Sequence, residues 1–357
     1  MNCVFDLSEL DRMVGRLFLC GLPGPRLDRG TRELISRYEP GGFILFSRNV
    51  EDPVQVAELC RELQEFALET HGRALFLAVD QEGGRVARLK KPFTEFPGNE
   101  AIAGDAKPEK KAQEFARITA EEMRLVGLNM DMAPVLDVRQ GPAEEHLRGR
   151  TFGEDPRLVA RLGGIVIKTL QGRGVMAVAK HFPGLGRASR DPHKALPEIS
   201  LSVDEMVSVD LSPFRSAVEA GVAGIMTSHA VYPSLDPDVP ATMSGRVVGD
   251  LLRKKMAYDG LVITDDLEMG AIARTWGVPR GSAAAFAAGA DLLLICEDQD
   301  LFAQSHALVR KKILAGELPL DSLHESLGRL ARARSRFLKK PLPASIAAIE
   351  ERLGKTA

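Results

Sequence analysis

Short apolar runs alternate with longer amphipathic stretches along almost the whole chain. The apolar runs have the length of β-strands, and most carry apolar side chains at successive positions rather than at every second one. This pattern is typical of parallel strands that are buried on both faces. It predicts eight strands, at residues 16–20, 42–46, 75–79, 129–136, 175–179, 224–226, 261–263 and 291–295.

The stretches between these runs have helical periodicity. Two of them open with Asp-Pro, at Asp52 and Asp155, which places a capping carboxylate ahead of a proline at the first helical position. Glycines such as Gly72 and Gly127 separate other helices from the strands that follow. Helices are predicted at residues 31–36, 54–68, 110–126, 158–170, 207–220, 245–256, 281–288 and 303–315.

Eight strands that alternate with eight helices predict an α/β fold, a single (β/α)8 TIM-type barrel. An open doubly wound sheet is the structural alternative. A ninth helix at 320–339 and a tail after it predict a short C-terminal helical extension. We therefore expect one barrel domain over residues 1–340, a C-terminal tail over 341–357 that packs on the barrel or frays, and no second domain.

Charge and composition narrow the possible partners. The 357 residues have a formal net charge of −2, which argues against nucleic acid or an anionic membrane as a partner. No basic segment precedes an apolar core near the N-terminus, and no apolar run has transmembrane length, so we expect a cytoplasmic protein. Cys3, Cys20, Cys60 and Cys296 form no CxxC pair and are expected to be reduced, most of them as small buried side chains.

Charged and polar side chains follow five of the predicted strands. In a TIM barrel all such positions face the same mouth, where active sites are built. The strand-end groups are Asp80 with Arg88, Asp137 with Arg148 and Arg150, Lys180 with His181, His229, and Asp265 with Asp266. Gly83 and Gly84 follow Asp80, and we expect them to let the backbone approach a ligand.

The segment at 174–193 carries the most specific signal. Its apolar strand stops at Lys180 and His181, and a loop broken by glycine and proline then leads to Asp191 and His193. An aspartate two residues before a histidine can orient the imidazole and tune its basicity. This spacing predicts a functional loop at the barrel mouth.

Several of these residues have alternative roles. Either of the adjacent carboxylates Asp265 and Asp266 can cap the segment that follows; we assign Asp265 to chemistry because it is nearer the strand. Lys180 could instead be a Schiff-base nucleophile, and Asp80 could form a structural ion pair with Arg88. For His229, a contact with a ligand and a packed position in the core are equally favoured interpretations.

A zinc or iron site is an alternative use of one set of side chains: His181, His193, His229, Asp191 and Asp265. No HExxH helix and no HxH pair at a strand end occurs, so we expect neither a metal nor a cofactor.

Taken together, the motifs resemble those of glycoside hydrolase family 3. The matching blocks appear in the family's order over about residues 41–270, at 80–86, 133–138, 149–152, 180–184, 191–193, 240–244 and 263–267. Within the family the chain looks like the single-domain β-N-acetylglucosaminidases of bacterial muropeptide recycling. Two positions depart from the usual pattern: Leu185 replaces a frequent second histidine, and Pro192 replaces a frequent serine.

The resemblance implies roles for the site residues. Asp265 would be the nucleophile that forms a covalent glycosyl-enzyme, and His193, oriented by Asp191, would be the acid/base. The residues implied to bind the N-acetylglucosamine ring are Asp80, Arg88, Arg150, Lys180 and His181, to which we add His229 as a further candidate.

The expected protein is thus a monomeric retaining exo-β-N-acetylglucosaminidase. Its expected substrates are small cell-wall muropeptides such as N-acetylglucosaminyl-anhydro-N-acetylmuramic acid. The alternatives are a family 3 β-glycosidase with another sugar specificity, a metal-dependent barrel hydrolase, and a sugar-binding protein without catalysis.

Overall fold

Eight parallel strands close into a barrel in the computed structural model, which describes residues 6–141, 145–188, 190–192, 195–339 and 342–354. The strand order around the barrel is β1-β10-β9-β8-β7-β6-β3-β2. These strands are β1 (Phe18–Gly21), β2 (Gly42–Leu45), β3 (Phe76–Val79), β6 (Met130–Asp131), β7 (Met176–Phe182), β8 (Gly224–Thr227), β9 (Leu261–Asp266) and β10 (Leu292–Ile295). The predicted (β/α)8 barrel is confirmed, and the open sheet is excluded.

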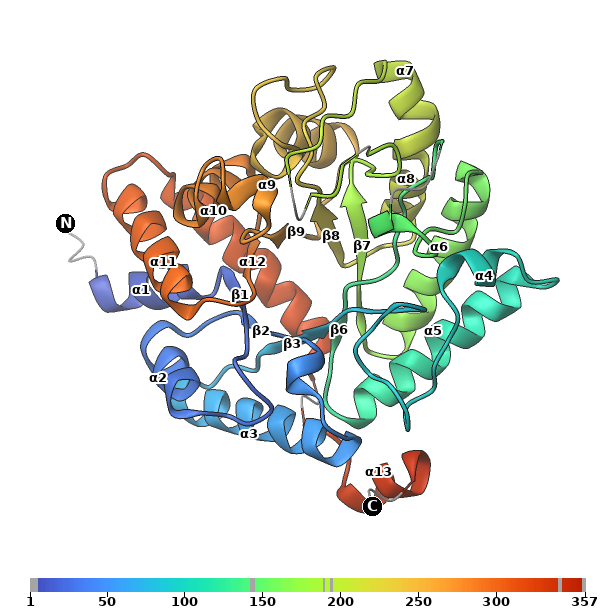
Figure 1. The fold of residues 1–357 in the computed structure, drawn as a ribbon. Helices are drawn as coiled ribbons and strands as arrows, with labels where there is room; N and C mark the ends of the chain where they lie inside the picture. Colours follow the sequence, from blue (N-terminus) through green and yellow to red (C-terminus); the bar gives the residue numbers. More distant parts are fainter. Residues whose placement is uncertain (1–5, 142–144, 189, 193–194, 340–341, 355–357) are drawn as a thin grey trace.

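The barrel strands are apolar because they are covered on both faces. Figure 1 shows helices around the barrel. The strand side chains are buried, because the inner ones fill the barrel and the outer ones pack on these helices. The longer helices are α1 (Leu7–Gly15), α2 (Arg29–Tyr38), α3 (Pro53–His71), α5 (Pro108–Leu125), α6 (Pro156–Gly172), α8 (Leu211–Glu219), α10 (Val278–Ala288), α11 (Gln299–Leu314) and α12 (Leu320–Phe337). Asp52 and Asp155 cap α3 and α6 as predicted.

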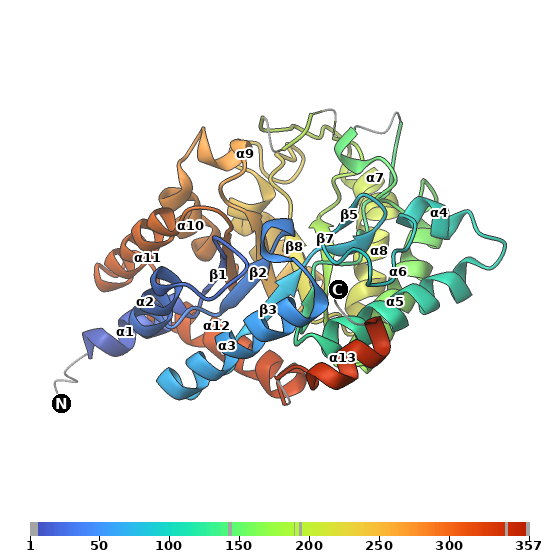
Figure 2. The ribbon, with the colours of Figure 1, turned by 60° about the horizontal axis from the view of Figure 1, so that its bottom comes forward.

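Shorter elements lie in the loops and at the end of the chain. They include the hairpin β4 (Gln81–Gly83) and β5 (Val86–Ala87), and the short helices α4 (Asn99–Ala103), α7 (Val203–Glu205), α9 (Gly270–Ala273) and α13 (Ile346–Leu353). The single-turn segments are η1 (Ser47–Asn49), η2 (Glu145–Leu147) and η4 (Ala241–Met243). Figure 2 shows β5 and α9 on the side of the barrel where the strands end, with α12 and α13 on the opposite side.

The fourth strand is the main departure from the sequence prediction. Residues 129–136 were expected to form one strand, but the regular ladder covers only Met130 and Asp131. Pro134 has no N–H to contribute, so the backbone after Asp131 follows β7 through separate contacts, including Leu136 N to the Lys180 carbonyl at 2.6 Å.

Two strands extend further toward the mouth than their apolar runs. β7 includes Lys180 and His181, and β9 includes Asp265 and Asp266. These four residues are therefore held by the backbone of the strands themselves, not only by the turns that follow. Polar side chains are tolerated there because the strand ends reach the barrel mouth.

Two predicted helices are wound differently from expectation. The helix expected at 245–256 is the π-helical segment η5 (Arg246–Lys255), and the one expected at 207–220 is divided into the π-helical η3 (Met206–Asp210) and α8. Apolar periodicity does not distinguish these windings over so few turns.

The C-terminal extension forms α12 and α13, and α13 packs beside α3 with Ile349 and Leu353 buried. Cys20, Cys60 and Cys296 are free and buried, as expected. Burial raises the pKa of the Cys60 thiol to about 12. In the described part of the chain no helix combines the length and apolar character that a membrane span requires.

Candidate active site

A cavity of about 520 Å³ opens at the barrel mouth, where the strand-end polar groups converge. Predicted site residues from several different strands and loops line it: Asp80, Arg88, Arg150, Lys180, His181, Asp191 and Asp265. His193 lies outside the described residues. The alignment of strand ends at one mouth therefore gathers most of the predicted site in one place.

A network of ion pairs forms one wall of the cavity. Lys180 Nζ lies 2.8 Å from Asp80 Oδ1 and 2.6 Å from Glu82 Oε1. Arg150 makes a bidentate pair with Glu82, with both N···O distances 2.8 Å. Arg88 reaches the second oxygen of Asp80 at 3.1 Å. Asp80 and Arg88 thus do form the ion pair that was expected as an alternative, and both residues also line the cavity.

The network keeps all of its members charged. Burial disfavours ionisation of Glu82, but Arg150 and Lys180 outweigh burial and lower its pKa to about 2. Burial likewise opposes the charge on Lys180, yet Asp80 and Glu82 raise its pKa above the ordinary value. A Schiff-base lysine needs a depressed pKa to be nucleophilic, so the structure disfavours that alternative for Lys180.

Asp137 holds His181 in a fixed orientation. Its Oδ2 lies 2.7 Å from His181 Nδ1, while its Oδ1 accepts the backbone N–H groups of His181 and Leu185 at 3.2 and 2.6 Å. Because a carboxylate oxygen can only accept, Nδ1 carries a proton that it donates to Asp137. Leu185 contributes its backbone to this arrangement and its side chain to the cavity wall.

The adjacent carboxylates of β9 differ in their electrostatics. Burial disfavours the ionised form of Asp265, but the rings of His181 and His229 and the hydrogen bond from the Asp266 N–H favour it and lower its pKa. Burial raises the pKa of Asp266 to about 7, and the neighbouring Glu268 and Asp265 charges add to this effect. Asp265 is therefore the carboxylate that is ionised throughout the neutral range.

His229 is buried behind the cavity rather than lining it. Its Nδ1 lies 2.8 Å from Thr242 Oγ1, and its Nε2 lies 3.0 Å from the Asp266 carbonyl. It is only 1% exposed. This placement favours the packed-residue alternative, with a role in positioning the Asp265–Asp266 segment, and the substrate contact stays a prediction.

The loop that carries Asp191 is fastened at several points. The Pro192 carbonyl accepts a hydrogen bond from Ala271 N of α9 at 3.1 Å, and Arg187 Nε lies 3.3 Å from Asp210 Oδ2 of η3. Asp191 and Pro192 both line the cavity. The described part of the loop therefore contacts elements that follow β7 and β9.

The double glycine after Asp80 has a different role from the one predicted. Gly83 and Gly84 have φ angles of +86° and +59°, as the hairpin turn between β4 and β5 requires. A Cβ on Gly84 would lie 2.8 Å from Gly98 Cα. The close approach is to the chain at 97–98, and neither glycine lines the cavity.

Sequence reasoning assigned no catalytic or substrate-binding role to Glu82, Asp137 or His146, although it placed Asp137 among the strand-end groups. Glu82 and Asp137 anchor the cationic wall and His181, and His146 lines the cavity itself. Glu82 and Asp137 do follow apolar runs, which is a usable signal. The segment containing His146 has no periodic pattern to place it.

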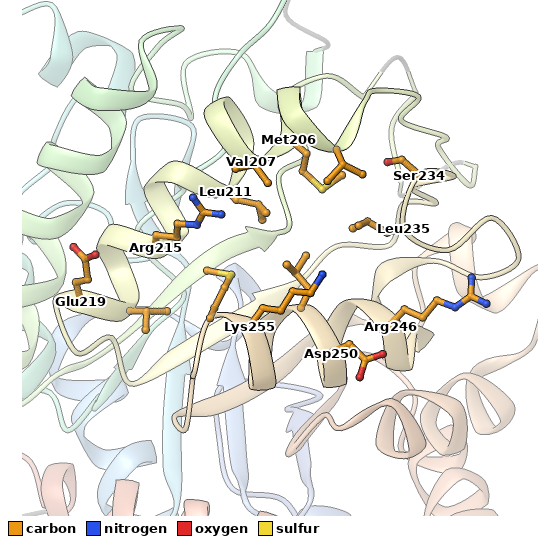
Figure 3. A pocket seen from close by; sticks show the side chains of 14 residues that line it. Met206, Val207, Leu211, Arg215, Glu219, Ser234, Leu235, Arg246, Asp250 and Lys255 are labelled. Atoms are coloured by element: carbon orange, nitrogen blue, oxygen red, sulfur yellow. The ribbon is translucent and has the colours of Figure 1, made fainter.

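A second cavity of about 550 Å³ lies outside the barrel mouth, between η3–α8 and η5 (Figure 3). Its floor is apolar, with Leu211 and Leu235, and charged side chains such as Arg215 and Lys255 stand at its rim. None of the strand-end groups lines it. Of the two cavities, only the one at the barrel mouth is lined by the predicted site residues.

Among the described residues, no group of three or more His, Cys, Asp and Glu side chains is arranged to hold a metal ion. His193, which the metal alternative also uses, lies outside this set.

Comparison with known proteins identifies the family. Residues 8–333 match the model of the glycosyl hydrolase family 3 N-terminal domain. A β-hexosaminidase of Pseudomonas aeruginosa is 37% identical over 292 residues, covering 80% of this chain and 84% of that protein. β-Hexosaminidase A of Pseudoalteromonas piscicida is 34% identical over 89% of this chain, which spans only 56% of that longer protein.

The solved structures agree. A family 3 β-N-acetylglucosaminidase from Paenibacillus superposes with a TM-score of 0.90 at 36% identity, covering 96% of this chain and 68% of that one. The fold and the mouth cavity define a barrel glycosidase, and the chain belongs to glycosyl hydrolase family 3. Its relatives place it with the β-hexosaminidases of that family.

Proposed function

We propose that this protein is a retaining exo-β-N-acetylhexosaminidase that removes terminal β-linked N-acetylglucosamine through a covalent glycosyl-enzyme on Asp265. The observation that carries the proposal is the ionised Asp265 carboxylate in a cavity whose wall is the Lys180–Asp80–Glu82–Arg150 network. A retaining glycosidase needs such a carboxylate on one face of the sugar.

The network provides fixed polar groups for the sugar. Lys180 and Arg150 present N–H donors, Asp80 presents carboxylate oxygens, and His181 is held in place by its hydrogen bond to Asp137. Because these groups are fixed by their partners before substrate arrives, they need little reorganisation on binding. Arg88 extends the same wall.

The proposed acid/base is His193, oriented by Asp191. Asp191 favours the protonated imidazole needed to protonate the leaving oxygen, and neutral His193 then removes a proton from the attacking water. A carboxylic acid at this place would repel Asp265 when ionised and raise the pKa of the nucleophile. An imidazole avoids that conflict. The Ala271–Pro192 hydrogen bond joins the loop to the chain just after the nucleophile.

The proposed natural substrates are muropeptides with N-acetylglucosaminyl-anhydro-N-acetylmuramic acid as their core. This follows from the resemblance to the recycling enzymes of the family and from the expected cytoplasmic location. The cavity size of about 520 Å³ suits a terminal sugar with part of its neighbour.

The nucleophile is tested by trapping. A 2-acetamido-2-deoxy-5-fluoro glycosyl fluoride should label the protein, and peptide mapping should place the label on Asp265. Asp265→Asn should lower kcat for 4-nitrophenyl N-acetyl-β-glucosaminide by at least a thousandfold and abolish labelling, whereas Asp250→Asn in η5 should retain both. Full activity of Asp265→Asn, or a label elsewhere, would refute the assignment.

The acid/base is tested by leaving-group dependence. His193→Ala should slow the natural disaccharide far more than an activated aryl glycoside, because a good leaving group needs little protonation. Equal losses on both substrates would count against His193. Saturable sugar binding by the wild-type protein with neither turnover nor label would instead support the non-catalytic alternative.

A further inference from the structure

His146 is a buried histidine in the wall of the active-site cavity. It lies in η2, in the loop between Asp137 and Arg150, and only 8% of it is exposed. Its backbone is fixed, because Arg150 Nη1 donates to the His146 carbonyl at 2.9 Å. The guanidinium that anchors Glu82 thus also holds the segment that presents this ring.

Both ring nitrogens of His146 are buried, and neither has a hydrogen-bond partner within the described part of the chain. Burying unpaired polar atoms costs free energy, so buried histidines usually have at least one partner. His306 follows this rule: it is also buried, and its Nε2 lies 2.8 Å from the Asp11 carbonyl. An unpaired ring that faces a cavity has the arrangement expected of a group whose partner is a ligand.

The environment of His146 determines which ligands it suits. Burial lowers the pKa of the ring to about 4, and although Asp191 favours the charged form, His181 and Arg150 oppose it. The ring is therefore neutral at physiological pH, with one N–H donor and one acceptor nitrogen. A neutral imidazole of this kind pairs with hydroxyl and amide groups, which also donate and accept.

We propose that His146 is a further substrate-binding residue, which hydrogen-bonds a hydroxyl or the acetamido group of the terminal sugar. The inference rests on the proposed function and extends its binding set. The terminal sugar is favoured over the leaving group because the ring lies among His181 and Arg150, two of the groups proposed to hold that sugar. Asp191, whose charge also acts on the ring, precedes the proposed acid/base by two positions in the sequence.

The test uses three variants and one small substrate. His146→Leu removes both nitrogens at similar volume, His146→Asn keeps one donor and one acceptor, and His306→Leu is the matched control outside the cavity. With 4-nitrophenyl N-acetyl-β-glucosaminide, His146→Leu should lower kcat/KM by about tenfold, the loss of one neutral hydrogen bond. His146→Asn should recover part of this loss, and inhibition by free N-acetylglucosamine should weaken in parallel.

Stability separates binding from a structural role. His146→Leu should keep or raise Tm, because it removes unpaired buried nitrogens, whereas His306→Leu should lower Tm and leave kcat/KM unchanged. The inference is overturned if an active wild type and His146→Leu share the same kcat/KM, or if only the disaccharide is affected, which would place the contact on the leaving group. Wild-type protein without glycosidase activity would refute the proposed function itself.

Discussion

Glu82 is the residue on which the cationic wall of the site depends. It is 1% exposed, yet it pairs with both Arg150 and Lys180, and these partners lower its pKa to about 2. Among the described residues, Lys180 also pairs with Asp80, and Arg150 forms no ion pair with a second carboxylate. A single carboxylate thus determines where two proposed sugar-binding groups point.

Glu82→Gln should therefore damage both stability and activity. The neutral amide leaves Arg150 and Lys180 buried without adequate countercharge, which we expect to cost about 3–5 kcal/mol in the free energy of unfolding. Because the two cations lose their fixed positions, kcat/KM should fall by roughly 10- to 100-fold, in analogy with other groups that orient ligand-binding residues. Urea unfolding and steady-state kinetics measure the two effects.

The control is Glu297→Gln, which removes an exposed partner of Arg48 at 2.6 Å. An exposed ion pair contributes little, so stability should change by less than about 1 kcal/mol and activity not at all. If Glu82→Gln behaves like this control, Glu82 does not organise the wall.

At the level of elements, the two ends of the barrel strands have separate tasks. The mouth ends of β7 and β9 carry the candidate site. At the opposite end of the barrel, Asp291 lies just before the first residue of β10. That carboxylate is fully buried and accepts hydrogen bonds from Val262 N, Arg253, Ser326 and Arg329. It thereby ties β9, η5 and α12 together on the side away from the cavity.

Asp291→Asn should lower stability without changing the chemistry. Replacing the buried carboxylate leaves the Arg253 charge without its partner, so we expect a loss of about 3–5 kcal/mol in the free energy of unfolding. Because this end of a TIM barrel serves stability, kcat/KM per folded molecule should stay within about twofold of wild type. Asp259→Asn, which removes an exposed carboxylate that also pairs with Arg329, is the matched control and should be nearly neutral. A large fall in kcat/KM of folded Asp291→Asn would contradict this division.

At the level of the whole molecule, the pH dependence of folding includes a buried acid beneath the proposed catalytic loop. Burial raises the pKa of Asp210 to about 6 from its ordinary value of 3.8, although Arg187 opposes the shift. One of its oxygens, Oδ1, is buried without a partner in the described residues. The raised pKa means that the folded state favours the protonated form.

The sign of the effect follows from linkage. The contribution of Asp210 to stability is complete below about pH 4 and is lost as pH rises through about 6. Asp210→Asn removes this pH dependence. Between pH 4 and pH 7 the free energy of unfolding of the variant should therefore rise relative to that of the wild type, by up to ~3 kcal/mol. Urea unfolding at several pH values measures it. Asp204→Asn, an exposed change on the neighbouring α7, should show no such shift, and a pH-independent difference for Asp210→Asn would disprove the raised pKa.

The sequence by itself determined the barrel and the general location of its site. Eight apolar runs can be buried on both faces only within a covered parallel sheet, and the charges after Val79, Ala179 and Ile263 had to meet at one mouth once the barrel closed. The nucleophile candidate Asp265 and the ring-binding set followed from those strand ends and the family's motifs, although their roles stay proposals.

Only the tertiary structure decided how these residues pair. Periodicity reports whether a side chain is buried but not which distant side chain lies opposite, so the Lys180–Glu82 and His181–Asp137 pairs were not predictable from the pattern. The burial of His229 and the lack of a partner for the His146 ring nitrogens among the described residues likewise arise from contacts between loops. Such contacts depend on three-dimensional packing, because the residues involved are far apart in the chain.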